Sequence, residues 1–158
     1  MIDILKYSLL GLVVLIFQVM LGDVFSILGL SPSFLVIFII YVGLSRSQMF
    51  AIWLGFFLGF IIDALTGTHM LGLSALALSV VGYLSGLFHS RIVRIPVIVQ
   101  YLLYTGFLLV FFIITVMVAL QDSQWATGNI FFLILIPKTI YTLALLSGIF
   151  IVLKVGAE

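Results

Sequence analysis

The sequence contains no cysteine and very few charged residues. Without cysteine, the chain can form no disulfide, no thiolate nucleophile and no Cys-based metal site. Charged residues make up 7% of the 158 residues, whereas a soluble domain carries roughly 25% to cover its surface. A water-exposed exterior built from this composition would aggregate, so the solvent around most of the fold must be lipid.

Several functional classes lack their characteristic patterns. The net charge is +1 and no basic run occurs, which argues against nucleic-acid binding. No G-x-S-x-G, H-E-x-x-H or P-loop pattern is present, and no paired nucleophile and base is visible. We therefore expect no catalytic residue, no cofactor and no metal site, and an intramembrane enzyme is the least favoured class.

The apolar residues occur in continuous runs. They make up 65% of the chain, and the mean hydropathy is +1.50. In lipid, each backbone N–H and C=O needs an internal partner, which leaves helices or closed barrels. Barrel strands alternate apolar and polar residues, but runs such as Tyr101–Leu120 do not alternate. The pattern predicts an all-α membrane protein.

Six segments approach the length of about 20 residues that a membrane-spanning helix needs: residues 4–21, 33–44, 48–65, 70–88, 96–120 and 129–153. The second is short for a full crossing, although Ser31-Pro32 before it is typical of a helix start. The first lacks a signal-peptide cleavage pattern, and we interpret it as a retained span. All loops are short, which predicts one compact bundle, a single domain over residues 1–158.

The basic residues predict the orientation. Every second connection and both ends of the chain carry the basic side chains Lys6, Arg46, Arg91, Arg94 and Lys154, while the other loops hold Asp23, His69 and Asp122. The positive-inside rule then places both termini in the cytoplasm. Arg46, Arg91 and Arg94 form a basic cytoplasmic rim, for which we expect contact with anionic lipid headgroups. A cytoplasmic partner is the alternative.

Small residues recur at helical spacing in the third and fourth spans. Gly55, Gly59 and Asp63 are four residues apart and share one helix face, and Gly82 and Gly86 repeat this spacing. Small residues at this spacing let two helix backbones approach closely. Packing of these two spans against each other is one interpretation, and a docking groove for the transmembrane helix of a partner is the other. The two can coexist on different faces of the helices.

Asp63, Lys138 and Pro137 predict local features of the spans: a polar contact at the first two and a helix kink at the third. Asp63 lies near the outer end of the third span, where nearby hydroxyls or backbone N–H groups could satisfy its carboxylate. Alternatively it pairs with Lys138 of the sixth span, which should lie at a similar depth. Pro137 removes one helical hydrogen bond, which predicts a kink in the sixth span.

In order along the chain, Pro32, Gly55, Gly59, Asp63, Gly67, Gly72, Gly82, Tyr83 and Gly86 resemble the pattern of the MreD family of rod-shape-determining membrane proteins. The resemblance implies a non-enzymatic component of the cell-elongation machinery at the bacterial inner membrane, supporting lateral peptidoglycan synthesis. It further implies a single-span MreC-like partner, the glycosyltransferase RodA and a class B penicillin-binding transpeptidase, with MreB filaments involved indirectly. The implied fold resembles the six-helix substrate-binding subunits of energy-coupling-factor importers.

A substrate-binding subunit of a vitamin or small-solute importer is the competing function. Asp63, Asn129, Lys138 and Tyr141 could line an outer pocket. Polar groups are sparse for a selective site, since a polar ligand needs several convergent donors and acceptors. The first span also reads Gly11-Leu-Val-Val-Leu15 where such subunits commonly carry Ala-x-x-x-Ala. A small molecule bound to the purified protein would favour this function.

Overall fold

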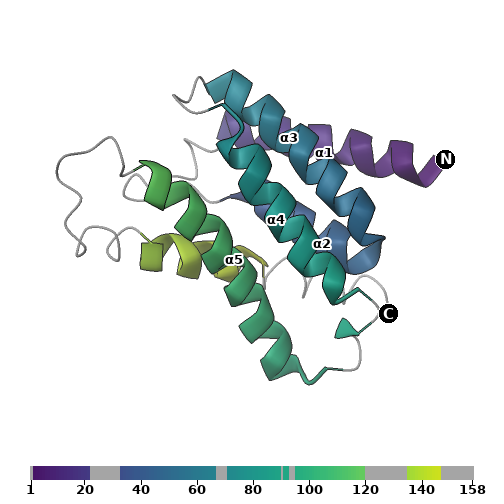
Figure 1. Ribbon diagram of the computed structural model, residues 1–158, viewed down its shortest axis with the longest axis vertical. Coiled ribbons are helices and arrows are strands. Elements are labelled where there is room, and N and C mark those ends of the chain that lie inside the picture. The colour runs from purple at the N-terminus through teal and green to yellow at the C-terminus, as the bar shows by residue number, and fades with distance from the viewer. Residues whose placement is uncertain are drawn as a thin grey trace.

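The computed structural model is built of helices throughout the part of the chain that it describes, which is residues 2–21, 33–66, 71–89, 91–92, 95–119 and 135–146. Five helices are labelled in Figure 1: α1 (Ile2–Leu21), α2 (Phe34–Ser45), α3 (Gln48–Thr66), α4 (Leu73–Leu87) and α5 (Val97–Ala119). A sixth helix, Leu135–Leu146, is drawn in yellow-green beside α5.

The helices coincide with the apolar runs of the sequence. The first five begin and end within three residues of the expected segments, and Leu135–Leu146 lies inside the last one. Two stretches, Gln48–Thr66 and Val97–Met117, are long and apolar enough to cross a membrane. The all-helical prediction is therefore confirmed for the described residues, while six crossings and their orientation stay predictions.

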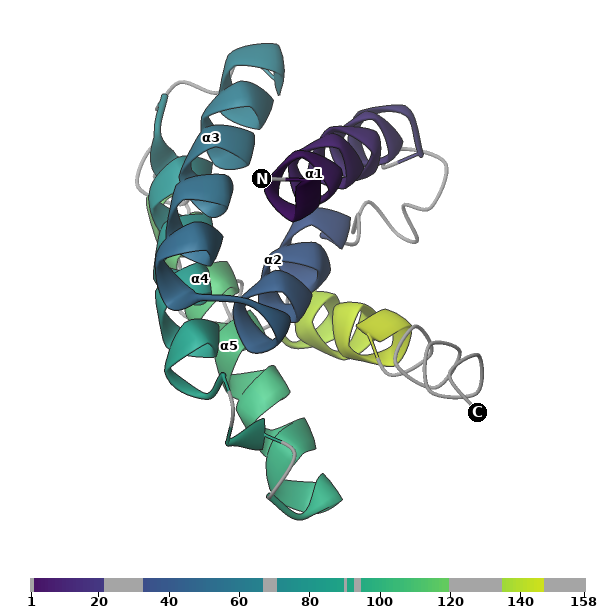
Figure 2. The same ribbon diagram turned by 90° about the vertical axis from the view of Figure 1, so that its right-hand side faces the viewer.

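Helix α2 forms the centre of the fold. Figure 2 shows it between α1 on one side and α3 and α4 on the other, with α5 and Leu135–Leu146 below. Almost every side chain from Leu35 to Leu44 is buried. With 12 residues, α2 is roughly 18 Å long, which is shorter than a hydrocarbon core of about 30 Å. Residues 22–32 lie outside the described residues.

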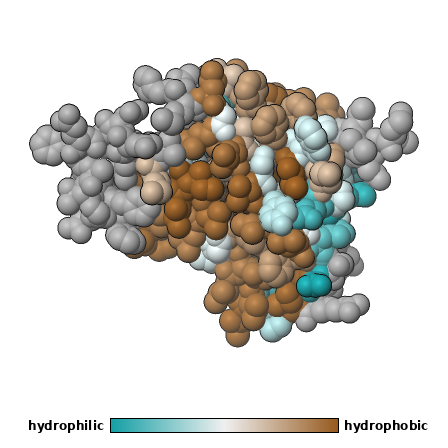
Figure 3. All heavy atoms as spheres, in the orientation of Figure 1, coloured by the Kyte–Doolittle hydropathy of each residue, from teal (hydrophilic) through white to brown (hydrophobic). Residues whose placement is uncertain are grey.

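The outer surface is largely apolar. Figure 3 shows hydrophobic residues over most of one face, with hydrophilic residues gathered on the side where α4 ends. Helix α1 buries only Gly11 and Leu15 among its described side chains and exposes large apolar ones on either side of them. A helix in water would hide such residues, so this exterior suits lipid or the helices of other proteins.

Candidate functional site

The glycines of the third and fourth predicted spans lie between α3 and α4. A Cβ atom built at Gly59 would lie 2.5 Å from the Cα and the backbone nitrogen of Ala75. A Cβ at Gly55 would lie 2.8 Å from the carbonyl oxygen of Leu78. Because real Cβ atoms almost never come this close to backbone, α3 can touch α4 at these points only with glycine in these positions.

The fourth helix presents its own glycines to α3 in the same way. A Cβ at Gly82 would lie 2.7 Å from the carbonyl oxygen of Ala51, and a Cβ at Gly86 would lie 2.6 Å from the Cα of Gln48. The two small-residue faces therefore meet each other along the whole pair of helices. A partner's helix could reach this face only if α3 and α4 separated, so the geometry supports the packing interpretation and gives the docking interpretation no room here.

Asp63 closes the end of this helix pair at which α3 stops and α4 begins. Its side chain is 1% exposed, and the backbone N–H groups of Gly72 and Ser74 each donate a hydrogen bond of 2.9 Å to its Oδ2 atom. Gly72 is the residue before α4 and Ser74 lies in its first turn, where a helix has no internal acceptors for its N–H donors. The Asp63 carboxylate thus caps α4 from α3 and holds the turn between the two helices.

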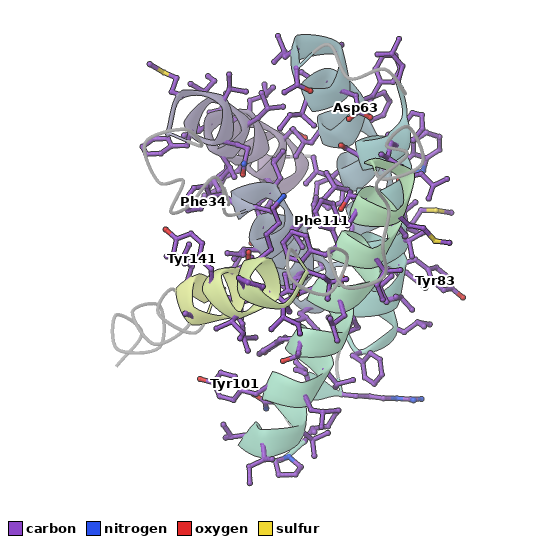
Figure 4. All side chains as sticks on the ribbon, turned by 90° about the vertical axis from the view of Figure 1, so that its left-hand side faces the viewer. Phe34, Asp63, Tyr83, Tyr101, Phe111 and Tyr141 are labelled. Carbon is purple, nitrogen blue, oxygen red and sulfur yellow. The ribbon has the colours of Figure 1, made fainter. Side chains whose placement is uncertain are left out.

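Asp63 is bonded to the backbone of Gly72 and Ser74, whereas the ion-pair hypothesis assigned Lys138 as its partner. Lys138 lies on the helix Leu135–Leu146, and Figure 4 shows Asp63 at the far end of α3, away from that helix. Among the described residues, no ion pair joins the two side chains. The nearby hydroxyl of Thr66 donates to the carbonyl oxygen of Ile62 at 2.7 Å and not to Asp63.

The remaining residues of the glycine pattern have separate roles or locations. Gly72 precedes α4 with a φ of 99°, a left-handed conformation that glycine adopts without strain. Tyr83 is exposed on α4 and points outward in Figure 4. Gly67 lies outside the described residues.

The predicted cytoplasmic rim is partly described. The guanidinium carbon of Arg46 lies 5.0 Å from the ring centroid of Tyr7, which is a cation–π contact between the α2–α3 turn and α1. The Nδ1 atom of His89 donates to the carbonyl oxygen of Leu44 at 2.8 Å and ties the end of α4 to the end of α2. Arg91 follows His89 by two residues and is exposed, and Arg94 lies outside the described residues.

Pro137 occupies the third position of the helix Leu135–Leu146 and is exposed. The residues that precede this helix lie outside the described part of the chain, so the kink stays a prediction. In the described part of the chain, no group of three or more His, Asp or Glu side chains is placed to hold a metal ion.

Two tertiary contacts have no counterpart in the sequence analysis. The Cβ position of Gly43 is filled by the side chain of Ser85, so α2 and α4 also pack at glycine distance. On α1, the Oε1 atom of Gln18 accepts a hydrogen bond of 2.6 Å from the Phe34 N–H at the start of α2. A single glycine and a single glutamine carry no repeating signal, and only the fold brings them to their partners.

The exposed side of α3 carries a set of contacting aromatic rings, which we name the aromatic face: Trp53, Phe56, Phe57 and Phe60. Trp53 stacks on Phe57 with ring centroids 6.0 Å apart, and Phe56 stacks on Phe60 at 6.4 Å. These contacts hold the rings against each other on the face of α3 that is turned away from α4. The spacing i, i+3, i+4, i+7 could have revealed this face from the sequence.

Comparison with known proteins identifies the family. A model of the family described as rod shape-determining protein MreD matches residues 1–155, essentially the whole chain. No curated protein and no solved structure gives a significant match, so the expected likeness to energy-coupling-factor subunits is not tested. The resemblance inferred from Pro32 and the glycine pattern is confirmed: the chain belongs to the MreD family and is a rod shape-determining protein of the inner membrane.

Proposed function

We propose that this chain is a non-enzymatic scaffold of the bacterial cell-elongation machinery, which binds the transmembrane helix of a single-span, MreC-like partner. The family match over residues 1–155 carries the proposal. Through that partner it would support the work of RodA and a class B transpeptidase in lateral peptidoglycan synthesis, with MreB filaments connected indirectly. A scaffold of this kind acts by contacting the active arrangement of its partners more favourably than the inactive one.

The physical character of the surface supports a binding role. The small-residue faces of α3 and α4 are used within the fold, whereas α1, the aromatic face and α5 expose large apolar side chains. Within lipid, helices associate through van der Waals packing and interhelical hydrogen bonds. These exposed faces therefore offer area for neighbouring helices without disturbing the core around α2.

Loss of cell shape is the direct test of this function. The native gene of a rod-shaped host would be replaced by the coding sequence of this chain, with an empty replacement as the control, and the length-to-width ratio of the cells would be measured. We expect rods with the chain and rounded cells without it. Co-purification of a co-expressed MreC-like protein from mild detergent tests the binding step. Rounded cells despite correct membrane insertion would contradict the proposal.

The proposed topology has six spans with both termini in the cytoplasm. The absence of cysteine makes it easy to test, because any introduced cysteine is the only thiol in the chain. Ser47 and Leu71 are exposed and lie beyond opposite ends of α3. We expect a membrane-impermeant maleimide to label Leu71→Cys in intact spheroplasts, and Ser47→Cys only after permeabilisation. The reverse pattern would overturn the orientation.

A further inference from the structure

Lys138 lies on a helix that is otherwise apolar or carries only hydroxyls. The buried side of the helix Leu135–Leu146 consists of Leu135, Thr139, Thr142 and Leu146. The opposite side exposes Ile136 and Ile140. At 100° per residue, Lys138 falls on the flank of the buried side, and its side chain is half-buried. Lys138 therefore lies at the edge of the buried face, where this helix meets the rest of the fold, and not on the exposed face that carries Ile136 and Ile140.

No counter-ion is available to Lys138 within the described part of the chain. Asp63 is the only carboxylate whose side chain the structure describes, and it accepts the N–H groups of Gly72 and Ser74. The hydroxyl of Thr142 donates to the backbone carbonyl of Lys138, not to its ammonium group. A charged side chain within a membrane span is costly and usually pairs with another group or serves a functional site.

We propose that Lys138 binds a carboxylate, from Asp or Glu, in the transmembrane helix of the partner. This inference rests on the proposed function and assigns one contact within it. Charge complementarity selects the occupant, because an ammonium group within a membrane span favours an anionic partner, and Asp63, the one carboxylate whose side chain the structure describes, is already bonded to Gly72 and Ser74. The contact also fixes the depth and the rotation of the partner's helix, because an ion pair forms only where both charged groups lie at the same depth and face each other.

The position along the span favours a partner's carboxylate over a lipid phosphate. Lys138 is nine residues from Asn129, where the predicted span begins, which corresponds to roughly 13 Å of helix. In a hydrocarbon core of about 30 Å, the Lys138 backbone then lies in the half of the predicted span that begins at Asn129, roughly 13 Å from the headgroups. Headgroup phosphates are remote from that level, whereas a carboxylate on an adjacent helix can lie at the same depth.

The experiment compares three variants of the full chain, co-expressed with the single-span partner and extracted into lipid nanodiscs. Lys138→Met removes the charge at similar length, and Lys138→Arg retains it. Lys6→Met makes the same chemical change at an exposed residue of α1. We expect Lys138→Met to reduce the co-purified partner at least tenfold, and the other two variants to stay within twofold of the wild type.

The thermal stability of the isolated chain separates a binding role from a structural one. If Lys138 serves a partner, Lys138→Met should melt at the same temperature as the wild type or higher, because an unpaired charge has been removed. A lower melting temperature, or full co-purification of the partner with Lys138→Met, overturns the inference. Loss of a bound anionic lipid from this variant in native mass spectra, with the partner retained, overturns it in favour of a lipid site.

Neutralising the partner's acidic residue completes the test. An Asp→Asn or Glu→Gln change in its transmembrane helix should cause the same loss as Lys138→Met, with no further loss when both are combined. A partner helix without any acidic residue refutes the inference. If the wild-type chain binds no single-span partner and fails to restore rod shape, the proposed function is refuted as well. If the wild type binds the partner and restores rod shape, and Lys138→Met does so equally well, only the Lys138 contact is refuted.

Discussion

Replacing Asp63 by alanine removes the acceptor of two hydrogen bonds that begin α4. The Oδ2 atom accepts from the N–H groups of Gly72 and Ser74 at 2.9 Å each. Truncating an N-cap side chain costs about 0.5–2 kcal/mol, and a hydrogen bond to a charged group contributes about 1.5–3 kcal/mol. Part of this is offset because the variant no longer buries a carboxylate. We expect Asp63→Ala to lower the free energy of unfolding by about 2–3 kcal/mol.

Reversible unfolding in mixed detergent micelles, followed by circular dichroism, measures this change. Asp63→Asn keeps an acceptor oxygen without the charge and should lose about 1 kcal/mol. Thr66→Ala is the matched control, because Thr66 bonds only the carbonyl oxygen of Ile62 on its own helix and is exposed. An Asp63→Ala protein as stable as this control would refute the capping argument.

A double-mutant cycle separates capping from the ion pair that the sequence suggested. Since Asp63 is bonded to α4 and not to Lys138, the effects of Asp63→Ala and Lys138→Met should add within about 0.5 kcal/mol. A larger coupling energy would show that the two side chains interact. In that event the position of Asp63 as a cap on α4 would need revision.

The remaining predictions concern helix contacts and use the same unfolding measurement. Gly59→Ala should cost about 1–3 kcal/mol, because its Cβ would lie 2.5 Å from the α4 backbone. A Cβ at Gly106 would have no atom within 4 Å, so Gly106→Ala should be neutral or stabilising by up to about 1 kcal/mol. Equal effects of Gly59→Ala and Gly106→Ala would contradict the close approach of α3 and α4. Gly72→Ala should cost about 1–2 kcal/mol, because its φ is 99°. Gln18→Ala removes the acceptor of the Phe34 N–H and should speed hydrogen exchange at that amide, with a loss of about 1 kcal/mol.

The positions of the helices followed from hydrophobicity. The apolar run 48–65 became the helix Gln48–Thr66, and 96–120 became Val97–Ala119. Such runs are readable because a helix in lipid satisfies its own backbone and needs no distant residue to form. For the same reason the spacing of Gly55 and Gly59 was enough to place them on one helix face.

The partners of individual residues did not follow from the sequence. The spacing of Gly55 and Gly59 suited both a neighbouring span and a foreign helix, and the fold showed that α4 covers them. The carboxylate of Asp63 had two plausible partners, and the turn that brings Gly72 back to it selected one. Contacts such as Gly43 against Ser85 carried no pattern from which they could be inferred.

By itself, the sequence determined that this chain is a bundle of apolar helices, which helices it contains, and to which family it belongs. These properties depend on composition and on residues that are close along the chain. Only the tertiary structure decided that the glycine faces pack against each other and that Asp63 caps α4. Those contacts join residues on different helices. The spacing of residues along one helix shows which of them share a face, but which other helix covers that face depends on how the whole bundle packs.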